Sequence, residues 1–129
     1  MLSKKDVINR AIQKSTRALK DAQNDFDDES LDSAINRLYY AIFYIVVALG
    51  YKHDFITSKH ATLMGWFNKK FIHEDKVFDT ELYKIYRNAF EFRNQSDYDF
   101  TFHPNEAVVK DLLRKAEEFI DIVRVELLK

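Results

Sequence analysis

The residues whose types and spacing could do chemistry are gathered in one short segment, Arg93 to Tyr98, which reads RNQSDY. Arg93 stays charged at neutral pH, and its planar guanidinium can hold two phosphate oxygens at once. Cleavage of RNA by attack of a 2′-hydroxyl needs such charge stabilisation, together with a group that moves protons. Tyr98 would be a poor base, because a tyrosine hydroxyl has a reference pKa of about 10. The constellation worth weighing as a site is therefore Arg93, Asn94 and then Tyr98.

Helical spacing puts Arg93 on the buried side of a predicted helix that runs from about Thr80 to Ser96. The inward stripe of that helix is apolar, and Arg93 continues it; the stripe consists of Leu82, Ile85, Tyr86 and Ala89. A buried cation needs an anion, a carbonyl or a ligand. Asp97 follows four residues later and can form a local ion pair. The pattern thus predicts either a site for an anionic ligand or a structural pair between Arg93 and Asp97.

The other chemical patterns give no metal or cofactor site. The four histidines form no HxxxH pair and the chain has no cysteine, so a zinc site is not expected; they are His53, His60, His73 and His103. The acidic stretch NDFDDES could hold Mg²⁺, but capping of the next helix accounts for most of it. Two glycines are too few for a phosphate-binding loop. We expect no metal and no cofactor, so side chains must hold any bound nucleotide.

Charge is balanced overall but unevenly distributed. The net charge of −1 gives no general basic field, and nothing indicates DNA binding. Residues 1–20 nevertheless carry six Lys or Arg and one acid. Three of these cations, Arg10, Lys14 and Arg17, lie on the face of the first predicted helix opposite its apolar stripe. A solvated face is the favoured interpretation, and a stripe that binds nucleic acid is the alternative.

The elements that must position these residues are long helices. With 129 residues, 47% of them hydrophobic, and only two glycines and one proline, the chain predicts one domain, 1–129, with few turns. We expect an all-α, antiparallel up-and-down bundle of four long helices and one shorter helix. The predicted helices run from Ser3 to Asp25, from Leu31 to Leu49 with Gly50 as a left-handed cap, from a cap at Ser58, from Thr80 to Ser96, and from about Pro104 onward.

His60 is in phase with the inner stripe of the short third helix. That stripe contains Leu63, Met64, Phe67 and Phe71. A packed or hydrogen-bonded core histidine is the favoured interpretation of His60, and a site residue is the alternative.

Nothing in the sequence predicts export or a membrane. The N-terminal residues lack the apolar core of a signal peptide, and the absence of cysteine fits a reducing cytoplasm. The longest apolar run, Leu38 to Tyr51, is shorter than the roughly 20 residues that span a bilayer. We expect a cytoplasmic protein that does not enter the membrane.

Three segments together resemble one family. The segments NRLYYAIFYIVVAL, SKHATLMGWFNKKFI and AFEFRNQSDYD look like those of the HEPN superfamily of small prokaryotic all-α proteins, in its stand-alone branch. The resemblance covers about Leu31 to Phe100 and implies a helical bundle that forms a homodimer. In many HEPN proteins an arginine, a following polar residue and a histidine four to six residues beyond it form a ribonuclease site. Arg93 and Asn94 match the first two positions, whereas the histidine places hold Tyr98, Asp99 and Phe100.

The same resemblance implies partners and ligands. Many family members work beside a minimal nucleotidyltransferase as a toxin–antitoxin pair. In some pairs that enzyme modifies a tyrosine near the histidine; Phe100 stands at that place here and Tyr98 is close by. The ligand-binding candidates are Arg93, Asp97 and Tyr98, joined by Arg37, Tyr40 and His60 from the other two segments.

Three functional hypotheses follow from the sequence. The favoured one is a dimeric module that binds nucleotide or RNA, works with a nucleotidyltransferase, and is catalytically weak or inactive because the motif histidine is missing. The first alternative is a metal-independent ribonuclease toxin in which Tyr98 or His103 replaces that histidine. The second is a structural module that binds another protein, with Arg93 and Asp97 forming a buried pair.

Overall fold

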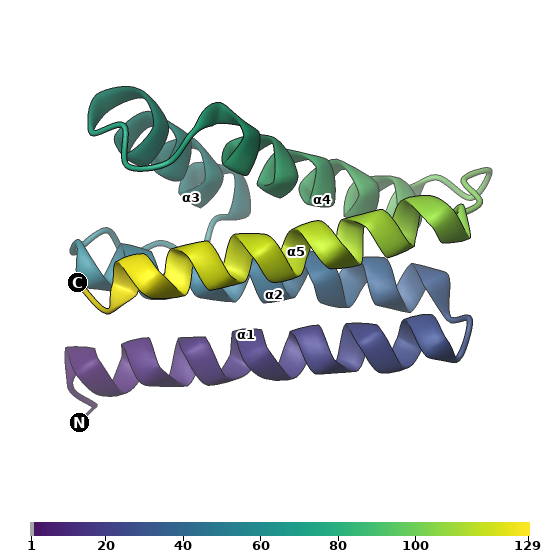
Figure 1. Cartoon of the computed structure of the whole chain (residues 1–129), viewed down its shortest axis with the longest axis horizontal. Coiled ribbons are helices and arrows are strands. Elements are labelled where there is room, and N and C mark those ends of the chain that lie inside the picture. Colours follow the sequence, from purple (N-terminus) through teal and green to yellow (C-terminus); the bar gives the residue numbers. More distant parts are fainter. Residues whose placement is uncertain (1) are drawn as a thin grey trace.

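The computed structural model describes residues 2–129 and contains no β-strand within that range. Four long helices alternate in direction and make an antiparallel up-and-down bundle (Figure 1). A short helix and a π-helical segment lie between the second and third of them. The elements are α1 (Lys4–Asp27), α2 (Leu31–Lys52), α3 (His60–Phe67), η1 (Asn68–Glu74), α4 (Thr80–Tyr98) and α5 (Glu106–Leu127). The predicted fold class, four long helices and a shorter one, is confirmed.

The second helix, α2, forms the centre of the bundle. It packs against α1, α3, α4 and α5, and it is buried almost all round because most of its residues are apolar. The face of α1 toward α2 is made of small residues, which lets the two helices approach closely; they are Ala11, Ser15, Ala18 and Ala22. The Ser15 hydroxyl donates a hydrogen bond to the Ala41 carbonyl at 2.6 Å. Each large apolar side chain buried in this core stabilises the fold by roughly 1.5–3 kcal/mol.

By length and composition, α2 is also a candidate membrane span. The helix has 22 residues, and its most apolar window has a mean hydropathy of 1.4. However, 67% of that window is buried inside the bundle. The core helix of a bundle passes the same test, so the composition of α2 is explained by packing.

The predicted role of Gly50 as a left-handed cap is wrong. The helix α2 continues through Gly50 to Lys52, and the left-handed residue beyond it is Asp54, with φ 61°. Gly50 is needed for a different reason. A Cβ atom at Gly50 would lie 2.5 Å from the carbonyl oxygen of Phe55, whose N–H donates to the Gly50 carbonyl at 2.8 Å. The glycine thus lets the following loop fold back onto the helix.

Two further predicted helix starts are displaced. The helix α3 begins at His60 after Lys59, and Ser58 does not cap it. The helix α5 begins at Glu106, where the side chain of Asn105 accepts from two backbone N–H groups, so Pro104 lies before the cap rather than in the first turn. The extended residue Lys59 is the N-cap of α3, and the polar residue Asn105 is the N-cap of α5.

The segment between α2 and α4 is rich in aromatic contacts. Trp66 stacks on Phe55, with ring centroids 4.9 Å apart and planes 6° apart, and its edge meets Phe71. Phe71 belongs to η1 and is buried in the core. These rings attach the loop after α2 to α3 and η1, and so set where His60 lies.

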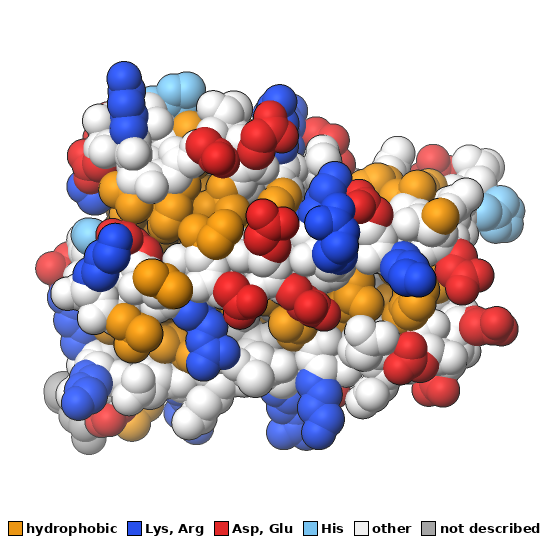
Figure 2. All heavy atoms as spheres, viewed as in Figure 1, with side chains coloured by type: hydrophobic (Ala, Val, Ile, Leu, Met, Phe, Trp, Pro, Cys, Tyr) orange, Lys and Arg blue, Asp and Glu red, His pale blue; other side chains and the backbone are white. Residues whose placement is uncertain are grey.

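The surface seen in Figure 2 is mixed in charge. Acidic and basic side chains alternate over α5 and α4, and hydrophobic side chains show mainly between α5 and the helices above it. This face therefore presents no single-sign field.

Candidate functional site

Arg93 lies where the helical spacing predicted, on the inner side of α4 near its end. Its side chain is 17% exposed, and its Nε lies 3.2 Å from Oδ2 of Asp97, so the predicted ion pair forms. The guanidinium lies over two rings of α2, 5.3 Å from the centroid of Tyr39 and 5.6 Å from that of Tyr40. The approach to Asp97 does not have hydrogen-bond geometry, so the buried Nε of Arg93 has no acceptor among residues 2–129. The charge is compensated, but the Nε donor is not.

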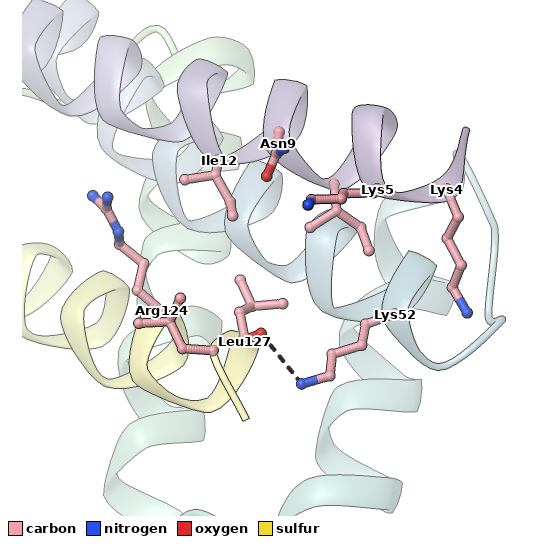
Figure 3. A pocket seen from close by; sticks show the side chains of 9 residues that line it. Lys4, Lys5, Asn9, Ile12, Lys52, Arg124 and Leu127 are labelled. Atoms are coloured by element: carbon pink, nitrogen blue, oxygen red, sulfur yellow. Dashed lines mark hydrogen bonds between the residues drawn. The ribbon is translucent and has the colours of Figure 1, made fainter. Parts of the chain in front are cut away.

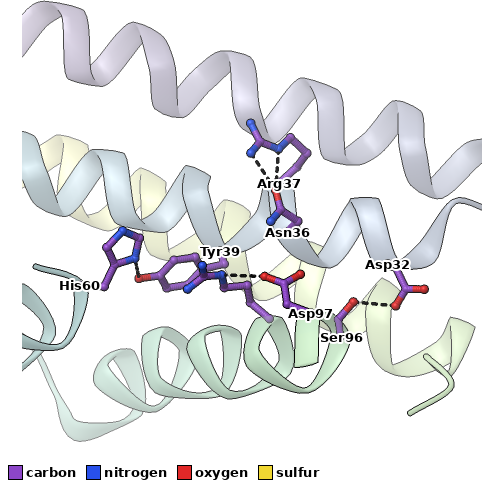
Figure 4. A network of polar contacts seen from close by, with 8 residues as sticks. Asp32, Asn36, Arg37, Tyr39, His60, Ser96 and Asp97 are labelled. Atoms are coloured by element: carbon purple, nitrogen blue, oxygen red, sulfur yellow. Dashed lines mark hydrogen bonds and ion pairs between the residues drawn. The ribbon is translucent and has the colours of Figure 1, made fainter. Parts of the chain in front are cut away.

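Tyr39 connects Arg93 to a histidine on another helix. Its hydroxyl lies 2.7 Å from Nδ1 of His60. In Figure 4 Tyr39 lies between His60 on one side and Asp97 on the other. Burial raises the pKa of the Tyr39 hydroxyl above its usual range, and the nearby charge of Arg93 opposes this only in part. The hydroxyl therefore keeps its proton and donates it to Nδ1, which assigns the ring proton of neutral His60 to Nε2.

His60 is the first residue of α3 and packs as the sequence predicted. Its ring stacks on Phe43, with centroids 4.1 Å apart, and meets the edge of Tyr40. Burial lowers the pKa of His60, and the charge of Arg93 lowers it further. His60 is thus neutral near pH 7 and partly accessible. We call Arg93, Tyr39, Tyr40, His60 and Asp97 the Arg93 cluster.

The other predicted site residues lie around this cluster or outside it. Arg37 stacks on Tyr40 at 5.1 Å and donates two hydrogen bonds to the Asn36 side chain, at 3.1 and 2.7 Å (Figure 4). Asn94 is half-buried beside Arg93. Tyr98 is 73% exposed at the last residue of α4. The structure therefore groups Arg93, Asp97, Tyr40 and His60, with Arg37 stacked on Tyr40, and leaves Tyr98 in solvent.

Sequence reasoning missed the role of Tyr39. The residue stands beside Tyr40 in the same helix, but it is fully buried and touches both Arg93 and His60. The only signal in the sequence was that a buried tyrosine hydroxyl needs a partner. Which partner it meets depends on the packing of three helices.

The sequence offered two further candidates, His103 as a base and the acidic turn as a metal site. His103 lies in the loop after α4 and lines a small apolar cavity of about 100 Å³ with Phe92 and Phe102. Among residues 2–129, no group of three His, Asp or Glu side chains could hold a metal ion. In the acidic turn, Asp25 accepts from Ser33 at 2.6 Å and Asp27 from Gln23 at 2.9 Å.

A cationic pocket lies at one end of the bundle, where the start of α1 lies beside the ends of α2 and α5 (Figure 3). Two of its lysines have partners. Lys4 pairs with Asp54 at 3.0 Å, and Lys52 donates to the last carbonyls of α5, those of Glu126 and Leu127. A lysine at this place also complements the negative end of the helix dipole. This pocket therefore joins α1, α2 and α5 and is less suited to an external anion.

The fold and the site place the protein in the class of small antiparallel helical bundles, with an arginine near a helix end held over aromatic rings of the central helix. The chain belongs to the HEPN family, because the model of the HEPN domain matches residues 8–126. A UPF0332 protein of Thermotoga maritima is 38% identical over 123 residues, which cover 95% of this chain and 92% of that protein.

Two archaeal relatives carry a functional name. The Methanocaldococcus jannaschii protein named "Putative toxin MJ0142" is 30% identical, over 88% of this chain and 77% of its own length. A second protein of that organism, "Putative toxin MJ0605", is 26% identical, over 93% of this chain and 94% of its own length. The chain is thus a HEPN protein similar to proteins named as toxins.

Proposed function

We propose that this protein is a toxin-like HEPN module that binds the phosphate groups of a nucleotide or of RNA through the Arg93 cluster. The observation that carries the proposal is the state of Arg93: a partly exposed guanidinium held over two tyrosine rings, with Asp97 as its one ion-pair partner among residues 2–129. A phosphate oxygen is a strong acceptor for such a donor, and hydrogen bonds between charged groups are the stronger kind. The neutral His60, with its proton on Nε2, adds a second donor nearby.

The same geometry argues for binding rather than fast cleavage. Cleavage through a 2′-hydroxyl needs a base, and the Nδ1 lone pair of His60 is already occupied by the Tyr39 hydroxyl. Tyr39 itself keeps its proton, because burial raises its pKa. The residue in the motif place, Tyr98, is exposed at the end of α4 and lies outside the Arg93 cluster. A weak or absent ribonuclease activity follows.

Titration of the purified protein with ATP and with a short RNA tests this function. Replacing Arg93 by Ala should weaken binding by about 10–100-fold, since a hydrogen bond to a charged group contributes about 1.5–3 kcal/mol. Arg93→Lys should recover only part of the loss, because lysine lacks the two-pronged geometry. Asp97→Asn should tighten binding, because the competing carboxylate is removed.

A matched control is available on the same helix. Arg87 pairs with Glu91 at 3.0 Å with the same four-residue spacing, but it is exposed. Arg87→Ala should leave both affinities unchanged. If Arg93→Ala binds ATP and RNA as the wild type does, Arg93 holds no ligand and the structural-pair hypothesis takes its place.

One observation favours ribonuclease activity as a second candidate: the fold brings His60 to Arg93 although the motif lacks a histidine. As a general acid His60 would have to be charged, which its surroundings disfavour at neutral pH. Any RNA cleavage should therefore be faster at pH 5 than at pH 7 and should disappear in His60→Gln. Cleavage that is fastest at pH 8, or that survives this substitution, would exclude His60 from the chemistry.

We further propose that the module forms a homodimer and acts with a minimal nucleotidyltransferase in the cytoplasm. Membership of the HEPN family and the two relatives named as toxins support this assignment. Co-expression with the product of a neighbouring gene, followed by co-purification, tests the partner. A nucleotidyltransferase that does not co-purify and does not change growth would contradict it.

A further inference from the structure

We propose that a groove along α1 and α2, next to the Arg93 cluster, binds a single-stranded segment of RNA. The proposal rests on the proposed function and assigns it a second contact surface. The groove has a volume of about 800 Å³ and is bounded by the N-terminal half of α1, the C-terminal half of α2 and the segment 56–60. We call it the α1–α2 groove.

The charge of the α1–α2 groove is of one sign. Arg10, Lys14 and Lys59 line it, and no Asp or Glu does. None of the three forms an ion pair within residues 2–129, whereas the cations of the pocket in Figure 3 are largely engaged. Arg10 and Lys14 are four residues apart on one helix, where like charges destabilise each other. An anion in the groove would relieve that repulsion.

The groove also offers aromatic faces beside these charges. Tyr40, Phe43, Tyr44, Tyr51 and His60 line it. Lys14 Nζ lies 5.0 Å from the centroid of the Tyr44 ring, and the rings of Tyr40 and Tyr44 are 5.7 Å apart. Cations that follow a backbone, combined with rings on which bases stack, are the two components of single-strand binding sites. A double helix would present phosphates but no free bases to these rings.

The groove is continuous with the Arg93 cluster. Tyr40 and His60 belong to that cluster and also line the groove: Arg93 lies over Tyr40, and His60 accepts from Tyr39. A strand lying along α1 and α2 can therefore present one of its phosphates to Arg93. The basic residues of α1 lie on two different surfaces, which the sequence did not indicate. Arg10 and Lys14 line this groove, whereas Arg17 lines a different hollow with Lys20 and Arg124.

Fluorescence anisotropy with a short labelled oligouridylate tests the groove. Tyr44→Leu should weaken binding by roughly tenfold, because stacking on one ring contributes about 1–3 kcal/mol per base, whereas Tyr44→Phe should bind nearly as the wild type does. Lys14→Ala should weaken binding and lower the slope of log affinity against log salt by about 0.7, as expected for one lost phosphate contact. Lys14 is exposed, so this variant does not disturb the core. The control Lys110→Ala, which replaces an exposed residue of α5, should change neither quantity.

Parallel titrations with ATP separate this inference from the proposed function, because a single nucleotide can occupy the Arg93 cluster alone. If Arg93→Ala does not affect ATP binding while Tyr44→Leu and Lys14→Ala weaken oligouridylate binding, the groove stands and the proposed function of Arg93 fails. If both groove variants bind oligouridylate as the wild type does, the groove proposal is overturned. It is also overturned if Tyr44→Leu changes only the sedimenting mass, since a second copy of the chain would then cover the groove.

Discussion

Arg93 enters the bundle from the end of α4 and lies against two aromatic rings as well as a carboxylate. A fully buried charge needs a partner, because removing one partner of a buried ion pair costs roughly 3–5 kcal/mol of stability. Asp97, however, has a side chain that is 32% exposed, so solvent weakens the pair. The rings of Tyr39 and Tyr40 supply the rest of the environment through their negative faces. Arg93 is therefore held in place by these groups, while part of its guanidinium still reaches solvent.

The acidity of His60 provides a test at this scale. Burial and Arg93 lower its pKa in the folded state, so the unfolded state binds more protons below the ordinary value of about 6.5. His60 should therefore make its full contribution to the free energy of unfolding above that pH. This contribution should be lost as the pH drops through the folded pKa. Proton NMR should place the titration of the His60 ring below 6.5, and Arg93→Gln should move it upward.

His53 needs a separate control, because burial and then Lys70 lower its pKa as well. Thermal unfolding of His60→Asn and His53→Asn, each followed between pH 5 and pH 8, assigns the two contributions. A His60 ring that titrates at or above its ordinary pKa would show that Arg93 does not act on it.

Some contacts of the helices depend on local sequence alone, and others depend on tertiary packing. The apolar spacing of α4 correctly predicted that Arg93 faces inward and that Asp97 pairs with it, because both depend on one helix alone. The contact between Tyr39 and His60 could not be predicted, because it requires α2 and α3 to pack in one orientation. The same reason explains Gly50, where a loop carbonyl, and not the local sequence, requires a residue without a side chain.

The two glycines give a matched pair of tests at the scale of the element. Gly50→Ala should destabilise the fold by about 1–3 kcal/mol, because its Cβ would lie 2.5 Å from the backbone oxygen of Phe55. Gly65→Ala should stabilise α3 by roughly 1 kcal/mol, since nothing lies within 4 Å of its Cβ and alanine favours helices. Denaturant unfolding measures both. Equal effects of the two substitutions would show that helix propensity alone decides, and that the loop does not press on α2.

Among residues 2–129, the most exposed large apolar side chain lies at one end of the bundle. Phe100 is 95% exposed in the loop after α4, close in sequence to the exposed Tyr98. Contiguous exposed apolar patches often mark an interaction surface. Since family resemblance implies a dimer, this end of the bundle is the place where we expect a second copy to bind.

Sedimentation equilibrium should accordingly give twice the 15.4 kDa mass of the chain. Phe100→Asp should shift the protein toward the monomer, because a buried charge at an interface is costly. Val125→Asp, which replaces another exposed apolar residue on α5, should not. Dissociation by the second substitution alone would place the interface on α5.

The stacking of Trp66 on Phe55 has a practical consequence for all of these measurements. Trp66 is the only tryptophan in the chain, and Phe55 directly precedes the residues 56–60 that border the α1–α2 groove. Any rearrangement of that segment changes the surroundings of a single indole. The protein thus carries its own optical probe, and the emission spectrum of unlabelled protein should respond to a strand in the groove while remaining silent to events at Phe100.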